Sequence, residues 1–284
     1  MASSVARSAH NATNSLHSLI YFAPEAEREL TRVGLRAGQM CYFAGRAAPM
    51  GAVGSGVVTA TFYNFNPELV ARSIPAAWEL ASPEVVVGAR FAAADAALTR
   101  LLGPDVTGSA DMTALADALR DAVSACEPEG RPLYAGHADL DWPDAPHLVM
   151  WHAASLLREH RGDGHTWALA VAGLSGIEAL VTHVATAKGF NPAFALSSRG
   201  WSQEEWDGAV TGLAARGLLD SEGELTPAGH EVRAQVEDQT DRLAAAPWQY
   251  LGEQRTEDVV RIGKAMTRAV LAAGAFPREI FAAR

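Results

Sequence analysis

The sequence has few cysteines and no long apolar run. Only two cysteines, Cys41 and Cys126, occur among 284 residues, so neither a disulfide framework nor a cysteine-rich zinc site organises the fold. No stretch approaches the roughly 20 uncharged residues of a membrane span, and polar residues rather than an apolar signal core follow residues 1–7. We therefore expect a cytoplasmic protein that is neither secreted nor embedded in a membrane.

Positive charge is also scarce. The chain has 23 Lys and Arg against 33 Asp and Glu, a formal net charge of −10, which repels a nucleic-acid backbone at long range. With 49% hydrophobic residues, the composition is that of a globular protein with a sizeable core. The length indicates two domains or one of double size.

Several signatures of catalysis are missing. The glycine cluster at 51–56 lacks the lysine of a phosphate-binding loop, and no Gly-x-Ser-x-Gly elbow occurs. No HExxH pattern is present, and we expect no metal site. Hydrolase and kinase activities therefore have no support in the sequence, and it specifies no cofactor.

Apolar residues recur at three- and four-residue spacings, which predicts a mainly α-helical fold. The expected helices cover residues 4–20, 24–33, 36–47, 57–65, 85–102, 111–126, 147–160, 166–172, 177–187, 230–243 and 256–273. A polar Gly-Asp-Gly segment at 162–164 is expected to break the helix after His160. Turns around 127–130 predict a boundary between a helical domain, 1–127, and a second domain, 128–284.

The C-terminal half has the pattern of a winged helix. Ser202 and Glu205 form a capping box that opens a helix, and Thr226 with Pro227 opens the next one. Between them, two short extended pieces around Glu222 predict a β-wing. Glycines and a serine at 173–176 separate two short helices at helix-turn-helix spacing.

This pattern, Leu-x-x-Arg-Gly-Leu-Leu followed by an acidic turn and Leu-Thr-Pro-Ala-Gly, resembles the MarR-like winged-helix group. The longer segments 21–26, 62–67, 157–165, 199–201 and 240–243 are similar to actinobacterial proteins labelled helix-turn-helix proteins. The resemblance implies a two-part helical protein and a homodimer formed through terminal helices such as 256–273, and carries over no established activity. Phe-Asn-Pro recurs at 65–67 and 190–192, which raises the hypothesis of an internal duplication.

The local charge argues against DNA binding by this winged helix. Residues 199–242 contain four basic and ten acidic side chains. A winged-helix domain that binds DNA needs basic groups on its recognition helix and wing. The sequence favours an acidic winged-helix scaffold that does not bind DNA.

The densest polar cluster comprises Arg158, Glu159, His160, Arg161, Asp163 and His165. Across the expected turn, His160 and His165 could converge on one ligand with Asp163 orienting either ring, which would suit acid-base catalysis. Arg158 and Arg161 could hold a carboxylate or phosphate. The alternative is structural: Asp163 caps the helix beginning at His165, and the arginines form ion pairs across the domain junction.

Other polar side chains are expected to line the same junction. His10 and His17 share one face of the first helix with Tyr21. They form either a ligand-facing stripe that could also bind a metal or haem, or polar positions at an interface between helices. Arg46 lies in an otherwise apolar stretch, as does Arg90, so each is either paired internally or faces a cavity. His152 lies two turns before His160 on one helix.

The sequence thus predicts a protein that binds a small molecule or cofactor at the junction of two helical halves. Arg158, Glu159, Arg161, His10, His17, Tyr21, Arg46 and His152 are the expected binding residues, with His160, Asp163 and His165 as catalytic candidates. The alternative is a ligand-responsive MarR-like regulator that binds DNA.

Overall fold

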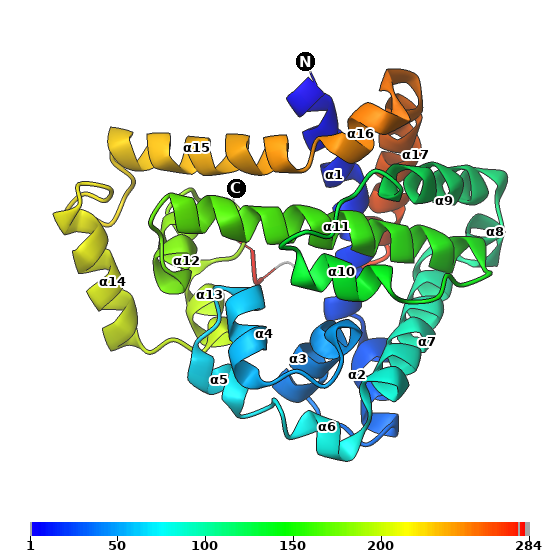
Figure 1. The fold of residues 1–284 in the computed structure, drawn as a ribbon, viewed down its shortest axis with the longest axis horizontal. Helices are drawn as coiled ribbons and strands as arrows, with labels where there is room; N and C mark the ends of the chain where they lie inside the picture. Colours follow the sequence, from blue (N-terminus) through cyan, green and yellow to red (C-terminus); the bar gives the residue numbers. More distant parts are fainter. Residues whose placement is uncertain (1, 278, 282–284) are drawn as a thin grey trace.

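The computed structural model describes residues 2–277 and 279–281, and throughout this part of the chain helices are joined by turns (Figure 1). The N-terminal helices are α1 (Ala2–Ser18), η1 (Leu19–Tyr21), α2 (Pro24–Arg32), α3 (Gln39–Ala47), η2 (Ala48–Met50), α4 (Ser55–Phe62), α5 (Pro67–Ala71), α6 (Ala77–Leu80), α7 (Pro83–Leu102), α8 (Pro104–Thr107) and α9 (Ala110–Val123). They are followed by α10 (Pro132–Ala138), α11 (Pro146–Val171), α12 (Gly176–Val184), α13 (Pro192–Arg199), α14 (Gln203–Ala215), α15 (Pro227–Leu243), α16 (Ala246–Leu251) and α17 (Glu253–Ala272).

The predicted helix starts are confirmed by their caps. The hydroxyl of Ser202 accepts a hydrogen bond from the amide of Glu205, whose carboxylate accepts one in return from the amide of Ser202. The hydroxyl of Thr226 accepts a hydrogen bond from the amide of Gly229 and so caps α15, whose first residue is Pro227. Such caps satisfy amides that have no partner within the helix.

The predicted β-wing is wrong, because residues 2–277 and 279–281 contain no strand. The segment after α14 makes one isolated bridge, between Leu219 and Leu225. The carboxylate of Asp220 accepts hydrogen bonds from the amides of Glu222 and Glu224, at 2.9 and 3.0 Å. These bonds close a compact turn, so the amides are not available for a strand ladder.

The predicted helix break at 162–164 is also wrong, since α11 runs uninterrupted from Pro146 to Val171. A Cβ atom at Gly164 would lie 2.9 Å from Arg131 Nη1 and 3.2 Å from the Cβ of Leu243. The glycine therefore allows close packing within a helix that is buried on several sides, and this packing outweighs its low helix propensity.

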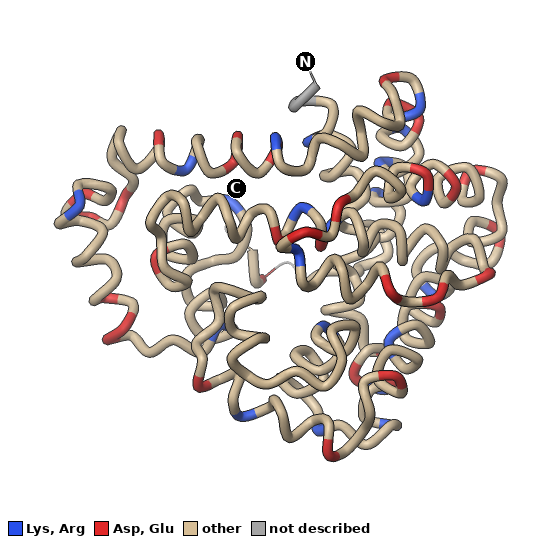
Figure 2. The backbone as a smooth tube through the Cα atoms, viewed as in Figure 1, with Lys and Arg blue, Asp and Glu red and all other residues tan. Residues whose placement is uncertain are grey.

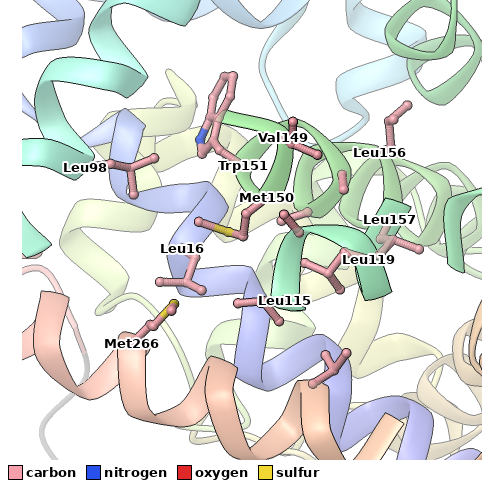
Figure 3. Packing of buried hydrophobic residues seen from close by; sticks show 14 of the residues in the cluster. Leu16, Leu98, Leu115, Leu119, Val149, Met150, Trp151, Leu156, Leu157 and Met266 are labelled. Carbon is pink, nitrogen blue, oxygen red and sulfur yellow. The ribbon is translucent and has the colours of Figure 1, made fainter. Parts of the chain in front are cut away.

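The largest hydrophobic cluster joins α1, α9, α11 and α17, and Leu16, Leu119, Trp151 and Met266 are among its members (Figure 3). It takes residues from both sides of the predicted boundary at residue 127. A second cluster lies among α3, α4 and α7, and a third joins the end of α11 to α12 and α14. The candidate site lies where the first two clusters meet.

No single helix among the described residues is long and apolar enough to cross a bilayer. The helices α11 and α12 meet the criteria of length and composition only as a pair, bent by 99°.

Candidate ligand-binding site

A cavity of about 300 Å³ lies among η1, α2, α3 and α7. Exposed Glu27 and Gly38 line its outer part, and buried Arg90 and Ala93 line its inner part. The other lining residues are Ile20, Tyr21, Phe22, Ala23, Pro24, Ala26, Leu30, Cys41, Tyr42, Gly45 and Arg46. The volume is at the lower end of the range for small-molecule sites, and the lining is mainly apolar and aromatic.

Arg90 is a buried cation with a neutral partner. Its side chain is 5% exposed in a helix rich in alanine and valine, and its guanidinium donates to His137 Nε2 at 2.8 Å. The other nitrogen of His137 bonds the carbonyl of Leu133, which can only accept, so Nε2 is the unprotonated nitrogen. Burial and then Arg90 lower the pKa of His137 to about 3. His137 thus positions Arg90 without neutralising it. Arg90 Nη2 has no hydrogen-bond partner among the described residues, and the guanidinium lies beside the hydroxyl of Tyr21.

Arg46 and Arg158 share one buried carboxylate. Glu159 accepts from Arg158 at 2.6 and 2.7 Å and from Arg46 at 3.3 Å. Burial alone would raise the pKa of Glu159, but the two arginines hold it well below its usual value. Arg46 Nε is buried without a partner. Two guanidinium groups therefore share one negative charge, while nearby Arg90 forms no ion pair within the described part of the chain.

Aromatic rings flank these cations. The guanidinium of Arg46 lies 4.2 Å from the ring centre of Phe62, and that of Arg90 lies 4.9 Å from Trp151. Burial would raise the pKa of Tyr42, but Arg46 and other nearby arginines lower it overall. Rings stabilise a guanidinium without adding negative charge, so the inner end of the cavity stays positive.

The predicted catalytic residues do not face a common cavity. Asp163 accepts from the amides of Leu133 and Tyr134, at 3.1 and 2.9 Å, and so caps α10 rather than the predicted helix at His165. Burial raises the pKa of Asp163 to about 6. His160 packs edge-on against Tyr134, whereas His165 bonds Thr240 of α15 at 2.8 Å. On the continuous helix α11, His160 and Asp163 both face α10, whereas His165 faces α15.

The predicted binding residues divide into three groups. His17, Tyr21, Arg46, Arg158 and Glu159 form one network, of which Tyr21 and Arg46 line the cavity. His10 and Arg161 line a separate space of about 10 Å³ beside α16, and Arg161 also pairs with Asp241 at 2.7 Å. His152 is buried against Phe91 and Trp142.

The polar groups Tyr42 and His137 were absent from the predicted binding residues, as was Ser155, whose hydroxyl lies 2.7 Å from His17 Nδ1. Arg90 was recognised as an arginine among apolar residues but was not assigned to the site. The same signal identifies Arg46, whereas nothing in the local sequence distinguishes His137 or Ser155. No group of three or more His, Cys, Asp or Glu side chains in the described ranges is arranged to hold a metal ion.

The segment that was predicted to form the winged helix carries acidic side chains at its surface. Glu204, Glu205 and Asp207 at the start of α14 are exposed, as are Asp220, Glu222 and Glu224 in the following turn. Figure 2 shows these two groups at the edge of the molecule formed by α14 and the start of α15. This surface is unfavourable for contact with a phosphate backbone.

Comparison with known proteins gives one family match. A family model described as a helix-turn-helix family matches residues 6–277, which is nearly the whole chain. No curated protein and no solved structure matches the sequence.

Proposed function

This chain belongs to the helix-turn-helix family, and we propose that it binds a small organic anion in the cavity among η1, α2, α3 and α7. One observation carries the proposal. Arg90, buried beside the cavity, has an unpartnered Nη2 atom and no carboxylate of its own.

The cost of burying charge explains why an anion is expected. An ionised group removed from water needs a counter-charge or a complete set of hydrogen bonds. Glu159 supplies one negative charge, and Arg158 already holds both of its oxygens. A carboxylate or phosphate can accept two parallel hydrogen bonds from a guanidinium group, and would supply the missing charge at Arg90 and Arg46.

Replacing Arg90 tests this proposal. We expect Arg90→Met to weaken binding of a small carboxylate about 100-fold or more, because charge-assisted hydrogen bonds in a buried site are lost. Isothermal titration with benzoate as the probe measures the effect. Arg28→Met is the matched control, since the Arg28 side chain is 53% exposed and pairs with Glu29 outside the cavity.

The proposal fails if benzoate and other small carboxylates do not bind the unmodified protein, or if Arg90→Met binds them equally well. The mass of the protein under native and denaturing conditions gives an independent measurement. A heavier native species would identify an anion that is retained during purification.

The alternative function is a ligand-responsive transcriptional regulator, which the family assignment favours. The exposed acidic groups on α14 argue against it, so we expect duplex DNA to bind more weakly than about 10⁻⁴ M at physiological salt. Titration of labelled duplex at several salt concentrations tests this. Tight binding that weakens linearly with the logarithm of salt concentration would favour the regulator. The MarR-like homodimer remains a proposal, for which native mass is the test.

A further inference from the structure

The hydroxyl of Tyr21 belongs to a chain of hydrogen bonds with a defined direction. Ser155 has one hydroxyl proton, which it donates to the carbonyl of Trp151 at 2.8 Å. Ser155 Oγ, 2.7 Å from His17 Nδ1, therefore accepts the proton carried by that nitrogen. A neutral imidazole has only one N–H group, so His17 Nε2 is an acceptor. Its partner is the hydroxyl of Tyr21, at 3.0 Å.

The surroundings of His17 keep the ring neutral and fixed. Its side chain is completely buried, and this burial together with Arg158 lowers the pKa of His17 well below its usual value. Glu159 opposes the shift from 4.0 Å, but its charge is shared with the arginines. The ring of Trp151 stacks on the imidazole, and its indole N–H donates to the carbonyl of His17 at 3.3 Å.

The proton of Tyr21 is thus committed to His17 while the tyrosine lines the cavity. Toward a ligand, the phenol oxygen can act only as a hydrogen-bond acceptor. We propose that Tyr21 recognises a hydroxyl group on the bound anion, so that the ligand class is a hydroxylated aromatic carboxylate. This inference rests on the proposed function, in which the arginines hold the carboxylate.

The walls of the cavity favour a ligand that contains an aromatic ring. The rings of Tyr21 and Tyr42 lie 5.4 Å apart between centres, and Phe22 completes an aromatic lining beside Ile20 and Leu30. A planar ring offers the stacking and edge contacts that such walls favour. A hydroxyl on that ring would donate to Tyr21, whereas an analogue without it would leave the buried oxygen without this bond.

Titration calorimetry with matched ligands tests the inference. The probes are benzoate, its 3-hydroxy and 4-hydroxy derivatives, and the corresponding methoxy compounds, which can only accept a hydrogen bond. We expect one hydroxybenzoate to bind at least about 10-fold more tightly than benzoate, and its methoxy counterpart to gain nothing. Tyr21→Phe should remove this preference, so that the hydroxybenzoate and benzoate then bind the variant with equal affinity.

A second variant tests the direction of proton donation along the hydrogen bonds that join Ser155, His17 and Tyr21. Ser155→Ala removes the acceptor for His17 Nδ1, so the imidazole proton is free to move to Nε2 and turn the bond to Tyr21 around. We expect the preference for the hydroxyl group to fall while benzoate still binds.

The possible failures are distinguishable. If benzoate binds but the hydroxyl and methoxy derivatives are not discriminated, the assignment of Tyr21 is overturned and the proposed function stands. A preference for the methoxy compound that Tyr21→Phe abolishes would show that Tyr21 donates, which also overturns it. If no carboxylate binds, both proposals fail.

Discussion

At pH 5 the protein is expected to be unfolded, although it folds at pH 8. Four histidine side chains are at most 3% exposed: His17, His137, His152 and His160. Burial is the main cause that lowers their pKa values, to about 3 for His137 and about 4 for His152 and His160. The pKa of His17 is also well below the ordinary value of 6.5. These histidines must gain protons when the chain unfolds in acid.

The direction in which folding stability changes with pH follows from proton linkage. The unfolded chain binds more protons than the folded one between about pH 4 and 6.5, so folding stability is complete above pH 6.5 and falls as the pH decreases. Each such histidine costs about 1.4 kcal/mol per pH unit below 6.5, so His137, His152 and His160 together cost roughly 6 kcal/mol at pH 5, and His17 acts in the same direction. Small proteins have about 5–15 kcal/mol in total. Asp163, whose pKa burial raises to about 6, acts in the opposite direction but is a single group.

Circular dichroism at 222 nm across pH 8 to 4, with urea unfolding at pH 8, 7 and 6, measures this transition. His152→Phe should move the midpoint of the acid transition to lower pH. The variant lacks the imidazole that is buried against Phe91 and Trp142, so the chain takes up one proton fewer when it unfolds. His230→Gln is the control, since His230 is exposed. Stability that is unchanged between pH 7 and 5 would contradict the prediction.

Glu159→Gln is expected to reduce the free energy of unfolding by about 3 kcal/mol or more at neutral pH. The carboxylate is the buried counter-charge of Arg46 and Arg158, and removal of one partner of a buried ion pair leaves the other without compensation. Burial would raise the pKa of Glu159, but Arg158 and Arg46 hold it far below its ordinary 4.5. The contribution of Glu159 to stability is therefore present above pH 4.5 and is lost as the pH falls through the pKa that Glu159 has in the folded protein.

Urea unfolding at pH 8 measures this loss. Asp121→Asn is the matched control, because Asp121 pairs with Arg255 at 2.7 Å while both side chains are about half exposed. Exposed ion pairs contribute about 0–1 kcal/mol, so the control should change little. A bound carboxylate should stabilise Glu159→Gln more than the unmodified protein, because the cavity then carries additional positive charge. Equal stability of the two variants would contradict the role assigned to Glu159.

The helices and their starts were predictable because their causes are local. The capping box of Ser202 and Glu205 lies within four residues, and the apolar spacing that marks a helix repeats every turn. The helix-turn-helix family could also be inferred from sequence segments. The acidic surface of α14 follows directly from residue identity, since exposed charges at a helix start need no distant partner.

The break at 162–164 and the β-wing could not be decided from local sequence. Gly164 is a helix breaker by propensity, but contact with Leu243, nearly eighty residues away, makes a glycine necessary inside α11. In the turn after α14, the formation of a β-wing depended on which group accepts hydrogen bonds from the amides of Glu222 and Glu224. The carboxylate of Asp220 accepts them, and a neighbouring strand does not. Each outcome depends on a competition between a local preference and a tertiary contact.

For the site, the sequence by itself determined which residues carry unusual chemistry: arginines in apolar helices, and His17 one turn before Tyr21. The tertiary structure decided which of them meet. Glu159 faces Arg46 from 113 positions away, whereas its neighbour His160 packs against Tyr134 and His165 bonds Thr240 on another side of the same helix. The physical reason is that a helix rotates its side chains by about 100° per residue, so proximity in sequence separates groups that only packing between helices can bring together.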